Sequence, residues 1–165
     1  MRIYFIAYMT DENTQYISAE KLQEFKDEFK RLRDIRVPEI AKRIDDARQM
    51  GDLSENAEYH AAREEMSWTQ SRIKELEFIL QNAQLITSGG SVGSKTVTIG
   101  AVIVVEVNGK KREYTIVGAQ EADPSMGKIS NESPLGQAFL GKKKGEKVSV
   151  TVPAGVQVYE ILEIK

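Results

Sequence analysis

Two carboxylates stand close together in the segment MGDLSENAEYHAAREE, residues 50–65. Asp52 and Glu55 are three positions apart, and Gly51 precedes them. Carboxylate oxygens are ligands that Mg²⁺ prefers, and such a pair can share one ion while water and phosphate oxygens fill its remaining positions. Alone the pair would bind the ion weakly. It would become effective at a site that already holds a metal and phosphates, where a second ion activates water.

The same pair has a purely structural interpretation. With Asp52 as the N-cap of a helix, Glu55 is the third helical residue, which makes an Asp version of the capping box worth about 1 kcal/mol. Both carboxylates would also face the positive end of the helix dipole. The two roles are compatible because a carboxylate has spare lone pairs, and the local sequence leaves both open.

Other reactive residues are few, which excludes several kinds of site. The chain of 165 residues has no cysteine and one histidine, His60. Disulfides, thiol nucleophiles, zinc–thiolate sites and His-based metal clusters are therefore excluded within one chain. His60 itself is interpreted as a partly buried or surface side chain.

Basic and aromatic residues near the acid pair also have two interpretations. Arg48 and Arg63 could form ordinary ion pairs, with Asp45 for example, and would contact phosphates only if this region meets nucleic acid. The aromatic Trp68 is interpreted as a core residue rather than a stacking platform. The run at 142–144 is interpreted as a solvated turn before a strand.

Two amphipathic helical arms must position the acid pair. Apolar residues recur at spacings of three and four from about residue 19 to residue 84, with Pro38 predicting a kink or local adjustment near 36–38. Gly51 is the expected joint, so two arms of roughly 30 residues, about 45 Å each, would pack as an antiparallel coiled coil. The apolar stripe is Leu22, Phe25, Phe29, Leu32, Ile40, Ile44 and Ala47 on the first arm, and Ala57, Ala61, Trp68, Ile73, Leu76, Leu80 and Ala83 on the second.

The second half of the chain has the period of β-strands. A Gly/Ser-rich linker at 87–95 precedes it, and Asn108-Gly109 predicts a two-residue hairpin. Ser133, Pro134 and Gly141 have the order of N-cap, first residue and stop of a short helix, and residues 153–155 predict a second hairpin. The fold class expected is therefore α+β with two domains, a coiled-coil hairpin followed by an antiparallel sheet with a short helix.

Charge and hydropathy favour a soluble, cytoplasmic protein. We expect a monomer, with self-association through the coiled coil left open. The net charge is −2, so no global basic field attracts the chain to nucleic acid or membrane. The opening apolar run, residues 3–8, is too short for a signal sequence, and no run has the length of a membrane span.

Two strings resemble a known family. RVPEIAKRIDDARQMGDLSENAEYHAAREE, residues 36–65, and EADPSMGKISNESPLGQAFLGKKKGEKVSVTVPAGVQVYEI, residues 121–161, are similar to the bacterial transcript cleavage factors of the Gre family, GreA type. The resemblance implies an FKBP-like C-terminal domain. We expect a lead-in at 1–17, a coiled-coil hairpin at 18–86 with its acidic tip at 51–56, the linker at 87–95, and the FKBP-like domain at 96–165. Residues 1–8 look like an extension or an upstream start.

The resemblance also implies a function. In the family the C-terminal domain docks at the rim of the secondary channel of RNA polymerase, and the coiled coil enters the channel when the enzyme has backtracked. Asp52 and Glu55 match the two acids that help to hold the second catalytic Mg²⁺ and its water, so that the polymerase cleaves the 3′ end of its own transcript. The factor is then no enzyme itself, and its Mg²⁺ is shared with the polymerase.

Further positions are carried over from the family in the same way. Leu53, Asn56, Glu58 and Tyr59 match residues that support the tip. Arg48 and Arg63 match basic positions near the tip, and we expect them as contacts for extruded RNA. The polymerase-docking surface is expected around SPLGQAFLGKKKG, residues 133–145. Two alternatives remain open, a channel-binding inhibitor of the same fold that does not stimulate cleavage, and a coiled-coil adaptor whose acid pair is only a cap.

Overall fold

The computed structural model describes residues 14–50, 56–86, 95–152 and 155–165, and these divide into two compact units. One unit is the helical segment Glu20–Asn82, and the other joins the described residues of Met1–Ala19 to those of Ala83–Lys165. Within the described helices, none combines the length and the apolar character needed to cross a membrane.

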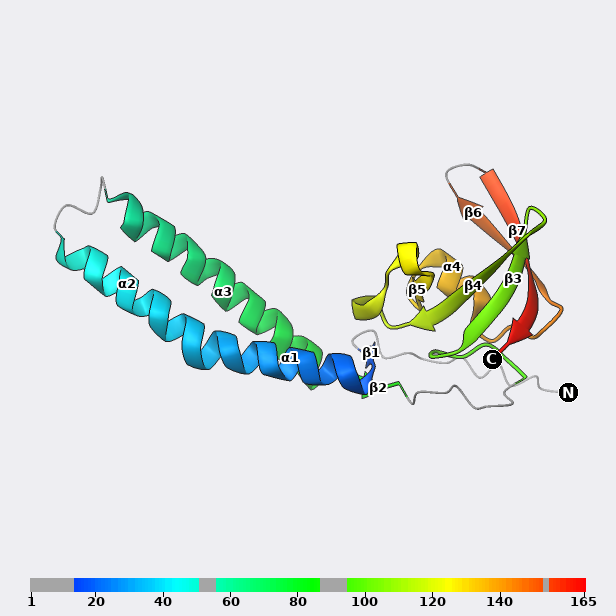
Figure 1. Ribbon diagram of the computed structural model, residues 1–165, viewed down its shortest axis with the longest axis horizontal. Helices are drawn as coiled ribbons and strands as arrows, with labels where there is room; N and C mark the ends of the chain where they lie inside the picture. The colour runs from blue at the N-terminus through cyan, green and yellow to red at the C-terminus, as the bar shows by residue number, and fades with distance from the viewer. Residues whose placement is uncertain (1–13, 51–55, 87–94, 153–154) are drawn as a thin grey trace, which may run out of the picture. The chain divides into compact units, whose positions relative to one another are not determined.

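The first unit is a helical hairpin, as the sequence predicts (Figure 1). Its first arm runs through α1 (Ala19–Arg31), a π-helical turn η1 (Leu32–Arg36) and α2 (Val37–Gln49), and α3 (Ala57–Gln81) returns beside it. The π-helical turn confirms the local adjustment expected at Pro38. Because Pro38 has no backbone N–H and its ring crowds the carbonyl four residues earlier, the preceding turn widens.

The apolar seam of the hairpin agrees with the prediction on the first arm. Phe25, Ile40, Ile44 and Ala47 are buried there, and near the closed end Ile40 and Ile44 pack with Ala62.

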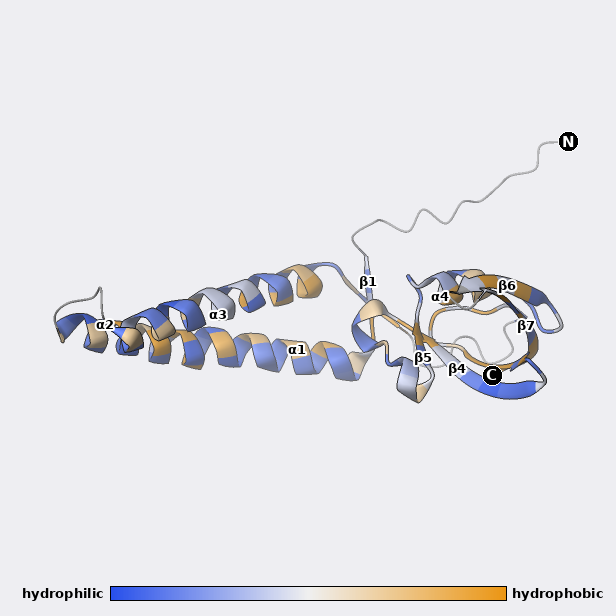
Figure 2. Cartoon of the chain, turned by 90° about the horizontal axis from the view of Figure 1, so that it is seen from above, coloured by the Kyte–Doolittle hydropathy of each residue, from blue (hydrophilic) through white to orange (hydrophobic). Residues whose placement is uncertain are grey.

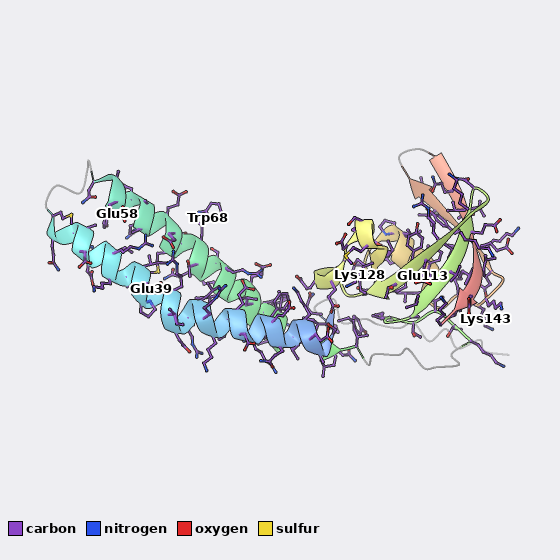
Figure 3. All side chains as sticks on the ribbon, in the orientation of Figure 1. Glu39, Glu58, Trp68, Glu113, Lys128 and Lys143 are labelled. Atoms are coloured by element: carbon purple, nitrogen blue, oxygen red, sulfur yellow. The ribbon has the colours of Figure 1, made fainter. Side chains whose placement is uncertain are left out.

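On the second arm the predicted stripe is wrong in the half near the tip. Ala62, Thr69 and Leu76 are buried at intervals of seven, whereas Trp68 is 71% exposed, and Ala57 and Ala61 are exposed as well. Trp68 projects from the outer side of α3 (Figure 3). The face that packs is thus rotated by one residue, because small side chains at positions 62 and 69 let the arms approach and the bulky indole would hold them apart.

The second unit contains a five-stranded sheet in the order β5-β4-β3-β7-β6. Its elements are β3 (Val102–Val107), β4 (Lys110–Val117), the 3₁₀ turns η2 (Ala119–Glu121) and η3 (Pro124–Met126), β5 (Lys128–Ser130), α4 (Pro134–Phe139), β6 (Lys147–Val152) and β7 (Gly155–Ile164). Three of the four strand pairs are antiparallel, but β4 and β5 pair in parallel, so the sheet is mixed. Figure 2 shows the hydrophobic character of β6 and β7 and the hydrophilic start of β4.

Local signals in this half of the sequence are confirmed. Asn108 and Gly109 both have positive φ, 52° and 73°, which is the conformation of a tight hairpin turn between β3 and β4. The Ser133 hydroxyl accepts a hydrogen bond from the N–H of Gly136 at 3.0 Å, and Pro134 follows it as the first residue of α4. Gly141 follows the C-cap Leu140 and ends the helix with a positive φ of 77°.

A small parallel sheet, β1 (Gln15–Ile17) with β2 (Ala83–Leu85), lies in the same unit as the large sheet. Ile17 is fully buried, and the N–H of Ser18 donates to Glu121 Oε1 at 2.6 Å. A Cβ atom at Gly118 would lie 1.7 Å from the Tyr16 carbonyl oxygen, so only glycine fits there. Strand β1 falls within the lead-in expected at 1–17, and β2 falls within the range expected for the hairpin.

Candidate functional site at the closed end of the helical hairpin

The acidic segment connects α2 to α3 at the closed end of the hairpin. Asp52, Leu53 and Glu55 lie outside the described residues, and the site is defined by the residues that flank them. Helix α2 ends at Gln49 with Met50 as its C-cap, and α3 begins at Ala57 with Asn56 as its N-cap. The acid pair is therefore carried by a five-residue connection whose two ends are defined.

Asn56 closes this connection through both ends of its side-chain amide. Its Oδ1 atom accepts from the N–H of Tyr59 at 3.1 Å, which caps α3, and its Nδ2 atom donates to the carbonyl oxygen of Ala47 at 3.0 Å. The same carbonyl accepts from the N–H of Met50 at 3.2 Å. One side chain thus satisfies a free donor of one helix and an acceptor in the last turn of the other.

This geometry corrects the capping box expected at Asp52 and Glu55. The N-cap of α3 is Asn56, with φ −84° and ψ 93°, and Glu58 is the acidic residue of the first turn. Asparagine and aspartate cap helices about equally well. Only the amide can also donate to Ala47, since an ionised carboxylate has no hydrogen to give. The acid pair is thereby not needed to cap α3.

Tyr59 supports the closed end from inside the hairpin. It packs against the buried cluster of Ile40, Ile44 and Ala62. The guanidinium carbon of Arg48 lies 5.9 Å from the centroid of the Tyr59 ring, and His60 meets the same ring edge-on at 5.6 Å. Two of the predicted site residues, Tyr59 and Arg48, are thus brought together.

The two basic residues predicted to contact RNA differ in their surroundings. Arg48 contacts Tyr59 and is 3.7 Å from Asp45 on its own helix. Arg63 is exposed on α3, and no ion pair joins it to another residue that the structure describes. Among the described residues, Arg48 has an acidic partner and Arg63 has none.

A ladder of ion pairs fixes the register of the arms behind the tip. Arg43 of α2 hydrogen-bonds Glu65 of α3 and lies 3.9 Å from Glu58, and Arg36 also hydrogen-bonds Glu65. The hydrogen bond from Arg43 is the main reason that the pKa of Glu65 is below its usual value. The predicted tip residue Glu58 therefore takes part in holding the arms together. Such exposed pairs contribute little individually and act mainly on register.

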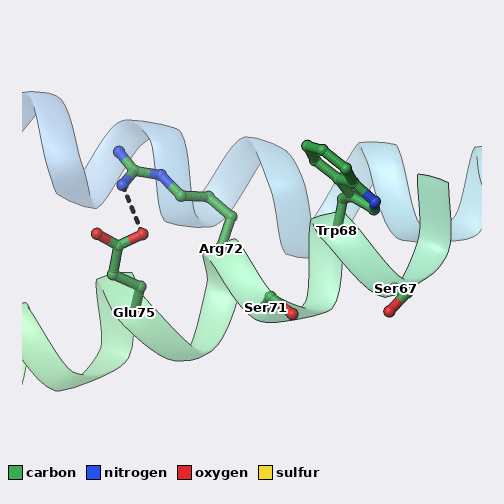
Figure 4. A pocket seen from close by; sticks show the side chains of 5 residues that line it. All are labelled: Ser67, Trp68, Ser71, Arg72 and Glu75. Atoms are coloured by element: carbon green, nitrogen blue, oxygen red, sulfur yellow. Dashed lines mark hydrogen bonds and ion pairs between the residues drawn. The ribbon is translucent and has the colours of Figure 1, made fainter. Parts of the chain in front are cut away.

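Farther from the tip, a clamp between Arg72 and Glu28 was not predicted from the sequence. Two hydrogen bonds of 2.9 Å join the guanidinium of Arg72 in α3 to both carboxylate oxygens of Glu28 in α1. Arg72 also donates a hydrogen bond of 2.9 Å to Glu75 of its own helix (Figure 4). The bond to Glu28 is the main cause of a raised pKa for Arg72, and it lowers the pKa of Glu28. Residues 44 positions apart carry no local spacing signal, although an arginine next to the seam is a favourable partner for a facing acid.

The described residues contain no group of three or more His, Asp or Glu side chains that could hold a metal ion. Asp52 and Glu55 are not among those residues. Their chemistry suits Mg²⁺, which prefers one or two protein carboxylates and completes its shell with water and phosphate oxygens. Any ion held by this pair would consequently be shared with a partner that supplies the other ligands.

Comparison with known proteins places both units in one family. Residues 15–85 match the N-terminal model of the transcription elongation factors GreA/GreB, and residues 92–165 match the C-terminal model. The chain is 42% identical over 159 residues to transcription elongation factor GreA of Bacillus cereus, covering 95% of this chain and 100% of that protein. It is 44% identical over 151 residues to transcription elongation factor GreA of Caldanaerobacter subterraneus subsp. tengcongensis, covering 90% of this chain and 96% of that protein.

Among solved structures, the crystal structure of GreA factor homolog 1 of Thermus thermophilus covers 92% of this chain and 99% of its own. Its sequence identity to this chain is 24% and the TM-score is 0.43. The chain belongs to the GreA/GreB family of transcription elongation factors.

Proposed function

We propose that this protein enters the secondary channel of RNA polymerase and stimulates cleavage of the transcript 3′ end in backtracked complexes. Family membership implies RNA polymerase as the partner. The observation that carries the finer proposal is the double hydrogen bond of Asn56, because it closes the connection that bears Asp52 and Glu55. A segment that is held at both ends loses less conformational entropy than a free segment when its carboxylates bind at another enzyme's site.

In the proposed mechanism the protein supplies ligands and the polymerase supplies the rest of the site. Asp52 and Glu55 help to hold the second catalytic Mg²⁺ and its water. When bound, that ion supplies water activation and stabilises charge at the phosphodiester. Tyr59 and Asn56 keep the ends of the acidic connection in place, and Arg63 offers an exposed cation to the phosphates of extruded RNA. The factor thus has no complete active site of its own.

Transcript cleavage in stalled elongation complexes tests this proposal. The wild-type protein is compared with Asp52→Asn and Glu55→Gln, and with Glu64→Gln as a control that removes one exposed carboxylate of α3. We expect both tip variants to lose at least tenfold in cleavage rate while they still bind the polymerase, and the control to cleave normally. Full cleavage by both tip variants would refute the metal-holding role. Slower elongation without cleavage by the wild type would instead identify a channel-binding inhibitor.

A further inference from the structure

A pocket of about 350 Å³ opens on the β-sheet unit, between the β3–β4 hairpin and β7. It is lined by Asn108, Lys110, Arg112, Tyr114, Gln157 and Tyr159. The cross-strand partners of Arg112 and Tyr114 are the fully buried Val105 and Ile103. Since directly paired residues point to the same side of a sheet, these two side chains lie on the face that also carries the core.

The three consecutive basic residues at the start of β4 point alternately to the two faces of the sheet. Lys110 and Arg112 lie at the pocket, whereas Lys111 pairs in register with Glu106 on the opposite face. Neither pocket cation forms an ion pair with a described residue, and none of the described residues that line the pocket is acidic. Three other lysines among the described residues of this unit do form ion pairs, Lys142 with Glu146 at 3.7 Å, Lys147 with Glu160 at 3.4 Å and Lys165 with Glu113 at 2.7 Å. The pocket therefore has a local excess of positive charge.

The neutral polar groups of the pocket also favour a ligand that accepts hydrogen bonds. The Tyr159 hydroxyl donates to Gln157 Oε1 at 2.8 Å, so the Gln157 amide retains its own N–H donors for a ligand. Tyr159 is only 5% exposed and packs edge-on against Phe139 at 5.6 Å, and burial raises its pKa. Tyr114 and Val107 add apolar surface beside the cations. An aliphatic stem that ends in a planar anion matches this lining.

We propose that this pocket binds an acidic side chain, Glu or Asp, presented by a partner polypeptide. The guanidinium of Arg112 forms a fork that fits both oxygens of a carboxylate, and Lys110 adds a second charge. The methylene groups of the acidic residue pack on Tyr114 and Val107. A nucleic-acid strand fits less well, because it requires a groove with repeated cations along its length. This site is separate from the acidic tip of the hairpin and does not depend on the function proposed for that tip.

Binding of short capped peptides to the full-length, ¹⁵N-labelled protein tests the proposal. One peptide, Ser-Leu-Glu-Leu-Ser, carries a single acidic side chain, and its matched partner, Ser-Leu-Gln-Leu-Ser, differs only in charge and donor pattern. We expect the acidic peptide to shift the resonances of Lys110, Arg112, Tyr114 and Gln157, with saturation on titration. The glutamine peptide should leave these resonances in place.

Two variants separate the pocket from general electrostatic attraction. Arg112→Gln should weaken binding of the acidic peptide at least tenfold, whereas Lys111→Gln removes the same charge one residue away on the other face and should change affinity less than twofold. Equal weakening in the two variants would overturn the proposal. Binding of both peptides with equal affinity would overturn it as well. So would inorganic phosphate or a uridine oligonucleotide shifting the same resonances at lower concentration than the acidic peptide, because the pocket would then be a phosphate site.

Discussion

The side-chain amide of Asn56 joins α3 to the last turn of α2 by donating to the carbonyl oxygen of Ala47 at 3.0 Å. The same side chain also caps α3 by accepting a hydrogen bond from the Tyr59 N–H. Together the two bonds tie the start of α3 to the end of α2. The two helices that flank Asp52 and Glu55 in the sequence are therefore joined through a residue that carries no charge.

Replacement of Asn56 by aspartate tests this dependence. Asn56→Asp keeps an oxygen for the Tyr59 N–H but turns an acceptor toward the Ala47 carbonyl. We expect about 1 kcal/mol of lost stability and a clear loss of transcript cleavage. Asn82→Asp is the matched control, because Asn82 donates to the Phe78 carbonyl at 2.8 Å at the other end of α3. Normal cleavage by Asn56→Asp would show that the tip does not need this bond.

The exposed position of Trp68 predicts a small effect of its removal. Trp68→Ala should change the free energy of unfolding by less than about 0.5 kcal/mol, whereas Leu76→Ala in the seam should cost about 2–5 kcal/mol. Because the chain has one tryptophan, its fluorescence reports this site alone. We expect emission typical of a water-exposed indole and efficient quenching by iodide. Blue-shifted emission that resists the quencher would contradict the seam described here.

The clamp of Arg72 on Glu28 predicts a dependence of hairpin stability on pH. The hydrogen bond from Arg72 holds the folded-state pKa of Glu28 below its ordinary value of 4.5. A lowered pKa contributes stability that is present above pH 4.5 and is lost as the pH falls through the folded-state pKa. Urea unfolding at about pH 7 and about pH 3 measures this loss, which we expect to be smaller in Glu28→Gln than in the wild type. An identical pH dependence in the two proteins would exclude the clamp as its source, and Glu64→Gln should behave like the wild type.

The close approach of Gly118 to β1 predicts that this small sheet is sensitive to a single methyl group. A Cβ atom at Gly118 would lie 1.7 Å from the Tyr16 carbonyl oxygen, so Gly118→Ala should displace β1. The N–H of Ile86 donates to the Ile17 carbonyl at 2.8 Å, and its hydrogen exchange should become much faster. Gly145→Ala is a control for strain elsewhere in the unit, because φ 84° strains that substitution locally while its Cβ atom would meet no described atom within 4 Å, and exchange at Ile86 should stay as in the wild type. Exchange at Ile86 that is unchanged in Gly118→Ala would contradict the packing.

Much of the fold follows from local signals in the sequence. The turn at Asn108-Gly109 and the cap at Ser133 depend on neighbouring residues, so their chemistry is visible in the sequence. The face that α3 buries does not follow from local signals, because it depends on which side chains let the two arms approach each other. The apolar periodicity alone wrongly placed Trp68 in the seam. The sheet was expected to be antiparallel throughout, and the short strand β5, which pairs in parallel with β4, was not predicted, because three residues carry too little pattern to indicate a strand or its direction.

The contacts made by the residues next to the acid pair could not be predicted from the local sequence. The resemblance selected Asn56, Glu58 and Tyr59, and the structure gives each a specific contact, with Ala47, Arg43 and the core cluster. Asp52 was expected to cap α3 because aspartate suits that position. The additional hydrogen bond across the arms, which favours an amide at the N-cap, depends on a carbonyl nine residues away on the other helix. A tertiary contact of this kind has no signature in local sequence.

The dependence of transcript cleavage on Mg²⁺ concentration tests the central claim most directly. The cleavage rate of a stalled elongation complex is measured across a Mg²⁺ titration with saturating wild-type protein, Asp52→Asn and the control Glu64→Gln. If Asp52 helps to hold the second Mg²⁺, the variant requires at least tenfold more Mg²⁺ to reach half of its maximal rate, and the control follows the wild type. A Mg²⁺ dependence of Asp52→Asn that coincides with that of the wild type would contradict the account.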